Sequence, residues 1–196
     1  MDKISISISN IKKDDLDNIL VLPVPKAERG LLEHMYLKKY FGVKFCTDEK
    51  RSDFPFYCNT VFSMFAVDLY GNCIGTLGDV GTLMDDNYKV GVINPLKKNF
   101  GTITDSIHEF LELYILFPQW YTEITKELPK EGSPVILEEA VAYLSSQFKL
   151  EQHCNLITKA QKNIQNTNFL VYEKIGKTKQ YYKLLKLPTS KMGFAP

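Results

Sequence analysis

Hydrophobic positions change their spacing along this chain, and each change predicts a new element. Apolar and polar residues alternate over Ile4–Ile8, which predicts a short strand with one buried face. Helical spacing predicts a helix over 28–41 that ends at Gly42. Residues 46–59 are rich in charge and contain a proline, so we expect a loop there. The apolar residues of the predicted helix are Leu31, Leu32, Met35, Tyr36 and Tyr40.

The middle of the chain predicts a small antiparallel sheet. The dense apolar run 61–68 predicts a strand with both faces covered. Gly71 and Asn72 tolerate positive φ, so they predict the turn into a second strand at 73–77. A third strand is expected at 88–93.

A helix should follow this sheet after a loop that ends at Ile103. Ser106 and Glu109 have the Ser-x-x-Glu spacing of a capping box, which marks a helix start. The residues that come next form one apolar stripe, so the helix should lie across the sheet. The stripe consists of Ile107, Phe110, Leu111, Tyr114 and Ile115.

The composition shifts after Trp120, and a different set of elements is expected. Apolar periodicity predicts helices at 135–148 and 151–164. Two strand-like runs, 169–175 and 180–187, flank a glycine turn and predict a closing hairpin.

These elements predict an α+β fold, with a mainly antiparallel sheet and helices packed on one face. Residues 1–124 are expected to form the central domain. Residues 125–196 are expected to form a C-terminal extension of helix, helix and hairpin, which could pack on the same core.

The composition limits the classes of partner that we expect. The chain has 196 residues, 44% of them hydrophobic, so it can bury a core without metals or disulfides. Its net charge of +1 gives no electrostatic argument for nucleic acid or a membrane surface. No apolar run approaches the roughly 20 residues of a membrane span.

The cysteines point to a reducing compartment. Four occur, none in a C-x-x-C pair, and the N-terminus lacks a signal-peptide pattern. We therefore expect free thiols, no disulfide and a cytoplasmic location. The cysteines are Cys46, Cys58, Cys73 and Cys154.

Few residue groups have the spacing that catalysis or metal binding needs. Glycines at 71, 75, 78 and 81 are followed by a strand, so they predict turns in a β-meander rather than a phosphate loop. Each histidine lacks a second ligand at metal-binding spacing. We therefore predict no metal, no cofactor and no catalytic residue. An enzyme whose site is assembled from distant residues remains an alternative.

Recognition is expected at the hairpin and the acidic loop beside it, because loops on a rigid sheet commonly bind partners. The acidic loop is expected to be solvated, with binding of a hard cation as the alternative. Trp120 could be an exposed anchor or could close the core at the helix end. The predicted partner-binding residues are Asp68, Tyr70, Asp79, Asp85, Asp86, Tyr88 and Trp120.

The last hairpin combines lysines with Tyr181 and Tyr182. Basic and aromatic residues together are typical of nucleic-acid binding. The neutral net charge favours a solvated strand face protected by lysines, so direct nucleic-acid binding is not expected.

The segment from Thr60 to Tyr121 resembles the SUKH superfamily of cell-wall-assembly regulators and toxin-immunity proteins. The resemblance rests on Phe65-x-x-Asp68-x-x-Gly71-Asn72, on Gly75, on Val90-x-Val92-Ile93, and on Gly101-x-Ile103-x-x-Ser106-x-x-Glu109-Phe110-Leu111. It covers about a third of the chain. The family's early Leu-Pro-acidic entry differs here, because Leu22-Pro23 is followed by Val24-Pro25.

This resemblance implies binding rather than catalysis. Bacterial members neutralise a toxin by covering its effector domain, so we expect an immunity protein with a protein partner. The alternative is a regulatory or scaffolding interaction module of the same fold.

Overall fold

The computed structural model describes residues 18–78, 88–126, 137–153 and 155–187. The predicted strand at Ile4–Ile8 lies outside these residues. The main sheet has seven strands. They are β1 (Ile19–Val21), β2 (Val43–Phe45), β4 (Phe62–Asp68), β5 (Cys73–Leu77), β6 (Val90–Asn94), β7 (Asn99–Thr104) and β10 (Lys183–Leu184).

Four of these strands form an antiparallel meander in the order β4-β5-β6-β7. Two short strands share the outer edge of β4. β1 runs parallel to the first half of β4, and β2 runs antiparallel to its second half. At the other edge, β10 runs parallel to β7. The prediction of a mainly antiparallel sheet in an α+β fold is therefore confirmed.

A smaller sheet joins β3 (Phe56–Cys58), β8 (Val171–Ile175) and β9 (Thr178–Tyr181). The predicted closing hairpin is present as β8–β9, with Gly176 at φ +61° in its turn. Its second strand is shorter than expected. The chain leaves the hairpin after Tyr181, and the next residues pair with the main sheet as β10.

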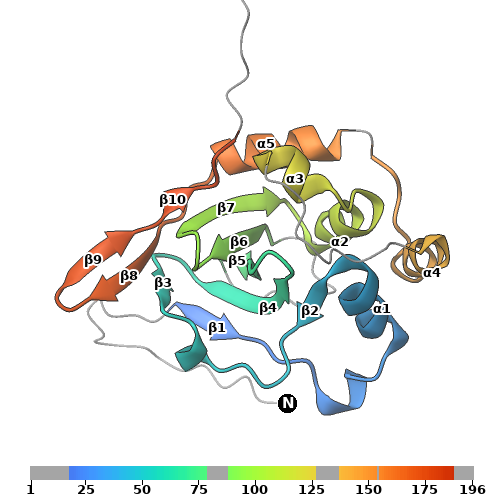
Figure 1. The fold of residues 1–196 in the computed structure, drawn as a ribbon, viewed down its shortest axis with the longest axis horizontal. Helices are drawn as coiled ribbons and strands as arrows, with labels where there is room; N and C mark the ends of the chain where they lie inside the picture. Colours follow the sequence, from blue (N-terminus) through green and yellow to red (C-terminus); the bar gives the residue numbers. More distant parts are fainter. Residues whose placement is uncertain (1–17, 79–87, 127–136, 154, 188–196) are drawn as a thin grey trace, which may run out of the picture.

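Helices pack on one face of the main sheet. Figure 1 shows α1, α2 and α4 on the right, α3 and α5 at the top, and the β8–β9 hairpin projecting at the left. The helices are α1 (Leu32–Phe41), α2 (Ile107–Leu116), α3 (Trp120–Thr125), α4 (Glu138–Phe148) and α5 (Leu156–Gln165), with short 3-10 helices at Lys26–Glu28 and Arg51–Asp53.

α2 lies at the centre of the helical layer and begins where the sequence predicted. The Ser106 hydroxyl accepts a hydrogen bond from the Glu109 amide, and the Glu109 carboxylate accepts one from the Asp105 amide. Phe110 of α2 is 1% exposed and packs edge-on against Phe65 of β4. The capped helix therefore covers the sheet.

Two hydrophobic cores lie on opposite faces of the main sheet. Phe65, Ile74 and Val92 belong to the core under the helices, whereas Phe62 and Ile93 belong to the core under the small sheet. The predicted C-terminal extension contributes to both. Its members are Ala140, Leu144, Leu156, Ala160, Ile164 and Leu185 in the first core and Phe169, Val171 and Tyr182 in the second.

Two segments that were predicted as loops contain regular structure. Residues 46–59 include β3, which forms by pairing with β8 more than a hundred residues later in the chain. The segment before α2 forms β7, although Gly101 interrupts its apolar pattern. A side chain at Gly101 would press against Leu185 and Ile164, so the glycine there allows close packing.

None of the helices within the described residues is long and apolar enough to cross a membrane.

Candidate functional site

The outward face of α1 carries unusually large apolar side chains. Leu31, Leu32 and Met35 are 46%, 39% and 56% exposed. Leu37 and Phe41, one helical turn apart, face the core instead. The predicted helix is confirmed with a later start, but three of the apolar residues assigned to it lie at the surface.

A hollow of about 320 Å³ opens beside these residues, between the start of α1 and the end of α4. Phe45 and Leu111 are nearly buried there and form its apolar floor. Leu31 and Phe148 also line it, and Glu28 and Glu33 supply carboxylates. The Glu33 carboxylate also accepts a hydrogen bond from the Tyr143 hydroxyl of α4.

A second hollow of about 250 Å³ shares His34 and Phe45 with the first. The imidazole of His34 packs on the Phe45 ring with centroids 4.8 Å apart. The cations of this second hollow are Arg29, Lys38 and Lys44. We call the two hollows and the exposed α1 residues Leu31, Leu32 and Met35 the α1 surface.

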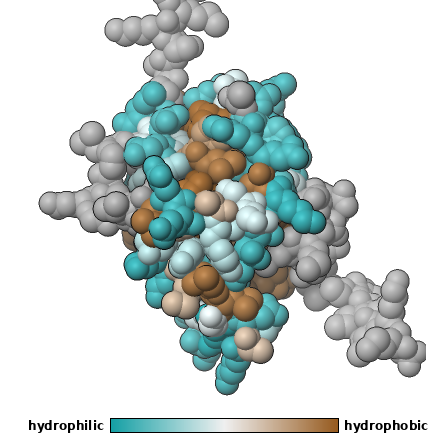
Figure 2. All heavy atoms as spheres, turned by 90° about the vertical axis from the view of Figure 1, so that its right-hand side faces the viewer, coloured by the Kyte–Doolittle hydropathy of each residue, from teal (hydrophilic) through white to brown (hydrophobic). Residues whose placement is uncertain are grey.

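The α1 surface therefore has an apolar centre with carboxylates at one end. The other end carries cations, of which Arg29 pairs with Asp48 and Lys44 pairs with Glu49. Figure 2 views the side of the molecule that carries α1 and α4 and shows hydrophobic residues grouped within hydrophilic surroundings. Contiguous exposed apolar residues with a polar rim are typical of protein-binding surfaces.

Asp68 was predicted to contact a partner, but it is 6% exposed. Its carboxylate accepts hydrogen bonds from the backbone amides of Tyr70 and Asn72, from the Asn72 side chain, and from the Tyr114 hydroxyl at 2.7 Å. Burial raises the pKa of Asp68, and the hydrogen bonds from Asn72 and Tyr114 oppose that shift. The carboxylate holds the β4–β5 turn against α2.

Tyr70 and Trp120 are also buried, at 9% and 1% exposure. The Tyr70 ring stacks on Tyr121 with centroids 4.2 Å apart, and Trp120 packs against Tyr114. The structure therefore removes Asp68, Tyr70 and Trp120 from the predicted contact surface. Trp120 closes the core after α2, which was the alternative drawn from the sequence.

The structure says less about the remaining predicted contact residues. Asp79, Asp85 and Asp86 lie outside the described residues. Tyr88 is partly exposed just before β6. The structure therefore does not bring the predicted set together as one surface.

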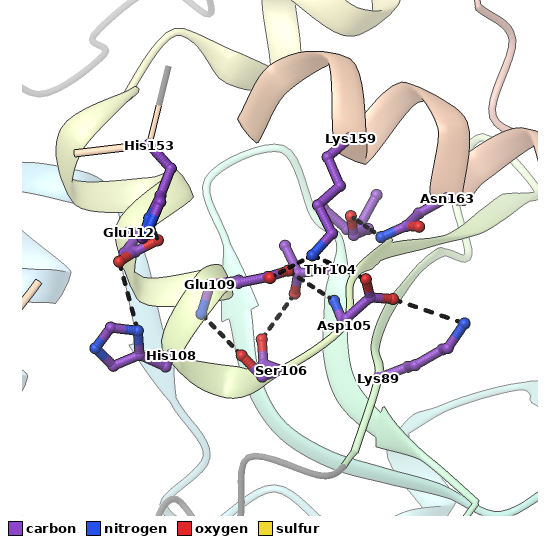
Figure 3. Close-up of polar contacts among 11 residues, drawn as sticks. Lys89, Thr104, Asp105, Ser106, His108, Glu109, Glu112, His153, Lys159 and Asn163 are labelled. Carbon is purple, nitrogen blue, oxygen red and sulfur yellow. Dashed lines mark hydrogen bonds and ion pairs between the residues drawn. The ribbon is translucent and has the colours of Figure 1, made fainter. Parts of the chain in front are cut away.

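The polar side of α2 holds a buried carboxylate between two histidines. The side chain of Glu112 is 1% exposed, and its Oε2 lies 3.0 Å from Nδ1 of His153. Oε1 lies 3.5 Å from Nδ1 of His108 and accepts a hydrogen bond from the Glu151 amide. The hydrogen bond with Glu112 and the charge of that carboxylate raise the pKa of His153. Figure 3 shows both histidines directed at this carboxylate.

A second polar group ties α5 to the start of α2. The Lys159 ammonium of α5 contacts the carboxylates of Asp105, at 3.0 Å, and Glu109. Asp105 also lies 3.6 Å from the Lys89 ammonium, and Asn163 donates to the Ile103 carbonyl. These contacts, drawn in Figure 3, fasten the C-terminal extension to the sheet and to α2.

A carboxylate bonded to Nδ1 of a half-exposed histidine is the arrangement that orients a general base. It is the strongest candidate for chemistry here. No group of three or more metal-ligating side chains occurs within the part of the chain that the structure describes. Sequence spacing gave no signal for this pair, since Glu112 and His153 are 41 residues apart.

The three described cysteines, Cys46, Cys58 and Cys73, are buried thiols. Burial raises the pKa of the Cys46 and Cys73 thiols to about 12. They are therefore poor nucleophiles.

Comparison with protein-family models gives no match, and neither does comparison with curated proteins or with solved structures.

Proposed function

We propose that the protein works by binding a protein partner at the α1 surface, as an immunity protein of the SUKH type that covers a toxin effector domain. The observation that carries this proposal is the outward apolar face of α1, where Leu31, Leu32 and Met35 are 46%, 39% and 56% exposed. Apolar groups in water are unfavourable, so a face of this kind gains free energy when a partner covers it.

The surroundings of this face indicate what the partner presents. Phe45 and Leu111 offer an apolar floor, and hollows on both sides of His34 can accept side chains. Glu28 and Glu33 favour a basic group at one end of the partner segment. Lys38 favours an acidic group at the other end, where Lys44 already pairs with Glu49. An amphipathic segment with charged ends fits this arrangement.

The relation of α2 to the sheet gives further support, because the SUKH resemblance rests on this part of the chain. α2 follows β7 directly and packs across the sheet through Phe110. The resemblance implies a helix that packs on the sheet in this position.

The test is co-expression with the product of the neighbouring gene, measured as rescue of growth and as affinity of the purified pair. The informative variant is Leu31→Asp with Met35→Gln. Leu31 is the N-cap residue of α1, and aspartate is a favourable cap, so the helix is retained. We expect affinity to fall about tenfold or more, as for interface hot spots, with loss of rescue.

Leu96→Asp is the matched control, because Leu96 is 84% exposed in the turn between β6 and β7, outside the α1 surface. It should bind and rescue like the wild type. Absence of both binding and rescue by the wild-type protein would contradict the proposal. Binding without rescue would instead favour the regulatory or scaffolding module.

A further inference from the structure

The outer face of the small sheet gathers aromatic and cationic side chains from distant parts of the chain. Tyr57 of β3, Tyr172 of β8 and Tyr181 of β9 lie opposite one another in the strand register, so they form a row across three strands. Their ring centroids are 5.6 Å and 5.7 Å apart. The neighbouring residues on β3 and β8, namely Phe56, Cys58 and Val171, point to the core.

Three cations lie against this row. The Arg51 guanidinium and the Lys174 ammonium lie 5.0 Å and 4.8 Å from the centroid of Tyr57. The Lys179 ammonium lies 4.8 Å from the centroid of Tyr172. Glu173 points to the opposite face, where it pairs with Lys98. The outer face therefore combines positive charge with aromatic rings.

A cavity of about 480 Å³ opens at the end of this row. Tyr181 is 55% exposed and lines it, together with Tyr172 and Lys179. Asn59 and Thr60 supply amide and hydroxyl groups on the other side. This volume lies in the range of small-molecule sites, about 300–1,000 Å³.

We infer that the outer face of the small sheet and its cavity bind a nucleotide unit, with the base stacked on Tyr181 and the phosphate near Lys179. Aromatic side chains stack on any base, and adjacent cations neutralise the phosphates. The Asn59 side-chain oxygen already accepts a hydrogen bond from the Leu170 amide, but its NH2 group and the Thr60 hydroxyl can bond the edge of a base. The ligand is either a free mononucleotide or one unit of a single strand.

This inference goes beyond the proposed function and departs from the expectation of no direct nucleic-acid binding. That expectation rested on net charge, which does not show that six residues from three segments share one face. The α1 surface lies on the opposite side of the molecule from the β8–β9 hairpin (Figure 1). Each site can therefore fail without the other.

The experiment measures fluorescence anisotropy of a labelled single-stranded oligonucleotide, with a duplex and a mononucleotide as competitors, between about 50 mM and about 200 mM salt. Wild-type protein should bind the single strand, and affinity should fall with salt. If the mononucleotide displaces the labelled oligonucleotide and the duplex does not, the ligand is a free mononucleotide. If the protein binds the oligonucleotide more tightly than the mononucleotide, the ligand is one unit of a single strand. Tighter binding of the duplex than of either would overturn the inference.

Two variants test the named side chains. Tyr181→Leu keeps an apolar neighbour for Tyr172 but removes the ring, and it should weaken binding by about fivefold or more. Lys174→Gln with Lys179→Gln should reduce the salt slope by about 1.4 on a single strand. Lys149→Gln with Lys162→Gln removes two exposed lysines from the helical side and should change neither quantity.

No binding of any probe at the lowest salt would overturn the inference, as would equal weakening by the control pair. Circular dichroism verifies that each variant is folded. The Leu31→Asp, Met35→Gln variant should bind the oligonucleotide like the wild type, which would show that the two surfaces act independently.

Discussion

Nδ1 of His153 lies 3.0 Å from Oε2 of Glu112, and this contact fastens the segment after α4 onto the middle of α2. The carboxylate is buried whereas the imidazole is half-exposed, so the histidine can exchange protons with water while its partner cannot be hydrated. The contact is therefore strongest when the imidazole is protonated.

This pair predicts a defined dependence of stability on pH. The pKa of His153 is raised in the folded protein by its hydrogen bond to Glu112 and by the charge of that carboxylate, with smaller contributions from Glu151 and Glu109. A raised pKa means that the folded state binds the proton more tightly. The stabilisation of the fold by this pair is complete below the histidine pKa of the unfolded chain, about 6.5, and disappears as pH rises through the pKa of the folded state.

Urea unfolding from about pH 5 to about pH 9 measures this effect. His153→Gln should be less stable than the wild type at the acidic end, with the difference closing at the alkaline end. His34→Gln removes a histidine that packs on Phe45 and should not reproduce that trend. A difference between wild type and His153→Gln that is constant with pH would contradict the assignment.

Truncation of Phe110 tests whether α2 supports the sheet. The ring is 1% exposed and packs edge-on against Phe65 with centroids 5.6 Å apart. Phe110→Ala should lower the free energy of unfolding by about 3–5 kcal/mol. Leu96→Ala, at a residue 84% exposed, should change it by less than about 0.5 kcal/mol. A loss below about 1 kcal/mol for Phe110→Ala in denaturant melts would show that the helix does not pack there.

The strands β4, β5 and β6 and the helix α2 could be predicted from the sequence because local patterns specify them. β5 has the predicted bounds, and α2 begins directly after the predicted cap Ser106. β3 could not be predicted, since this strand of three residues forms by pairing with β8, far along the chain. β10 falls within the strand predicted at 180–187, but its pairing with β7 instead of the hairpin could not be predicted. A strand of two or three residues is too short to show an apolar periodicity in the sequence.

The candidate sites were harder to predict than the fold. α1 has apolar residues around much of its circumference, so spacing alone did not show that Leu37 and Phe41 face the core while Met35 faces water. Asp68 was chosen as a polar residue beside a turn, but the turn folds over it. Burial is a property of tertiary packing, and a local pattern of residues does not report it.

Asp68→Asn should destabilise the protein although it changes few atoms. The carboxylate accepts bonds from the Asn72 side chain and the Tyr114 hydroxyl, and an amide nitrogen in place of one oxygen would face those donors. Unsatisfied buried donors cost about 1–3 kcal/mol each. Asp48→Asn is the control, because the Asp48 side chain is 83% exposed in its ion pair with Arg29. Equal stabilities of the two variants in urea melts would exclude this role for Asp68.

Thiol reactivity tests the burial of the described cysteines. Because burial raises the pKa of Cys46 and Cys73 to about 12, almost no thiolate is present near neutral pH. In a Cys154→Ser variant, the three remaining thiols should react with an aromatic disulfide reagent only after the protein unfolds. Rapid reaction of any thiol in the native variant would show that this part of the core opens. Fewer than three reactive thiols after unfolding without reductant would reveal a disulfide.

Gly42 ends α1 in the left-handed region, at φ +67°, where its amide donates to the Leu37 carbonyl. A Cβ at this position would lie 2.4 Å from Cδ2 of Leu69, so an added methyl meets both an unfavourable backbone angle and a packed neighbour. The backbone angle alone costs an L-residue about 1–2 kcal/mol, and Gly42→Ala should therefore lose at least that much stability in urea melts. Gly30→Ala is the matched control, because a Cβ there meets no atom within 4 Å and its φ is not positive. It should be neutral or slightly stabilising, since alanine restricts the unfolded chain more than glycine does. If Gly42→Ala were as stable as Gly30→Ala, the end of α1 and its contact with Leu69 would have to differ from the structure, and the position of the α1 surface would need to be assigned anew.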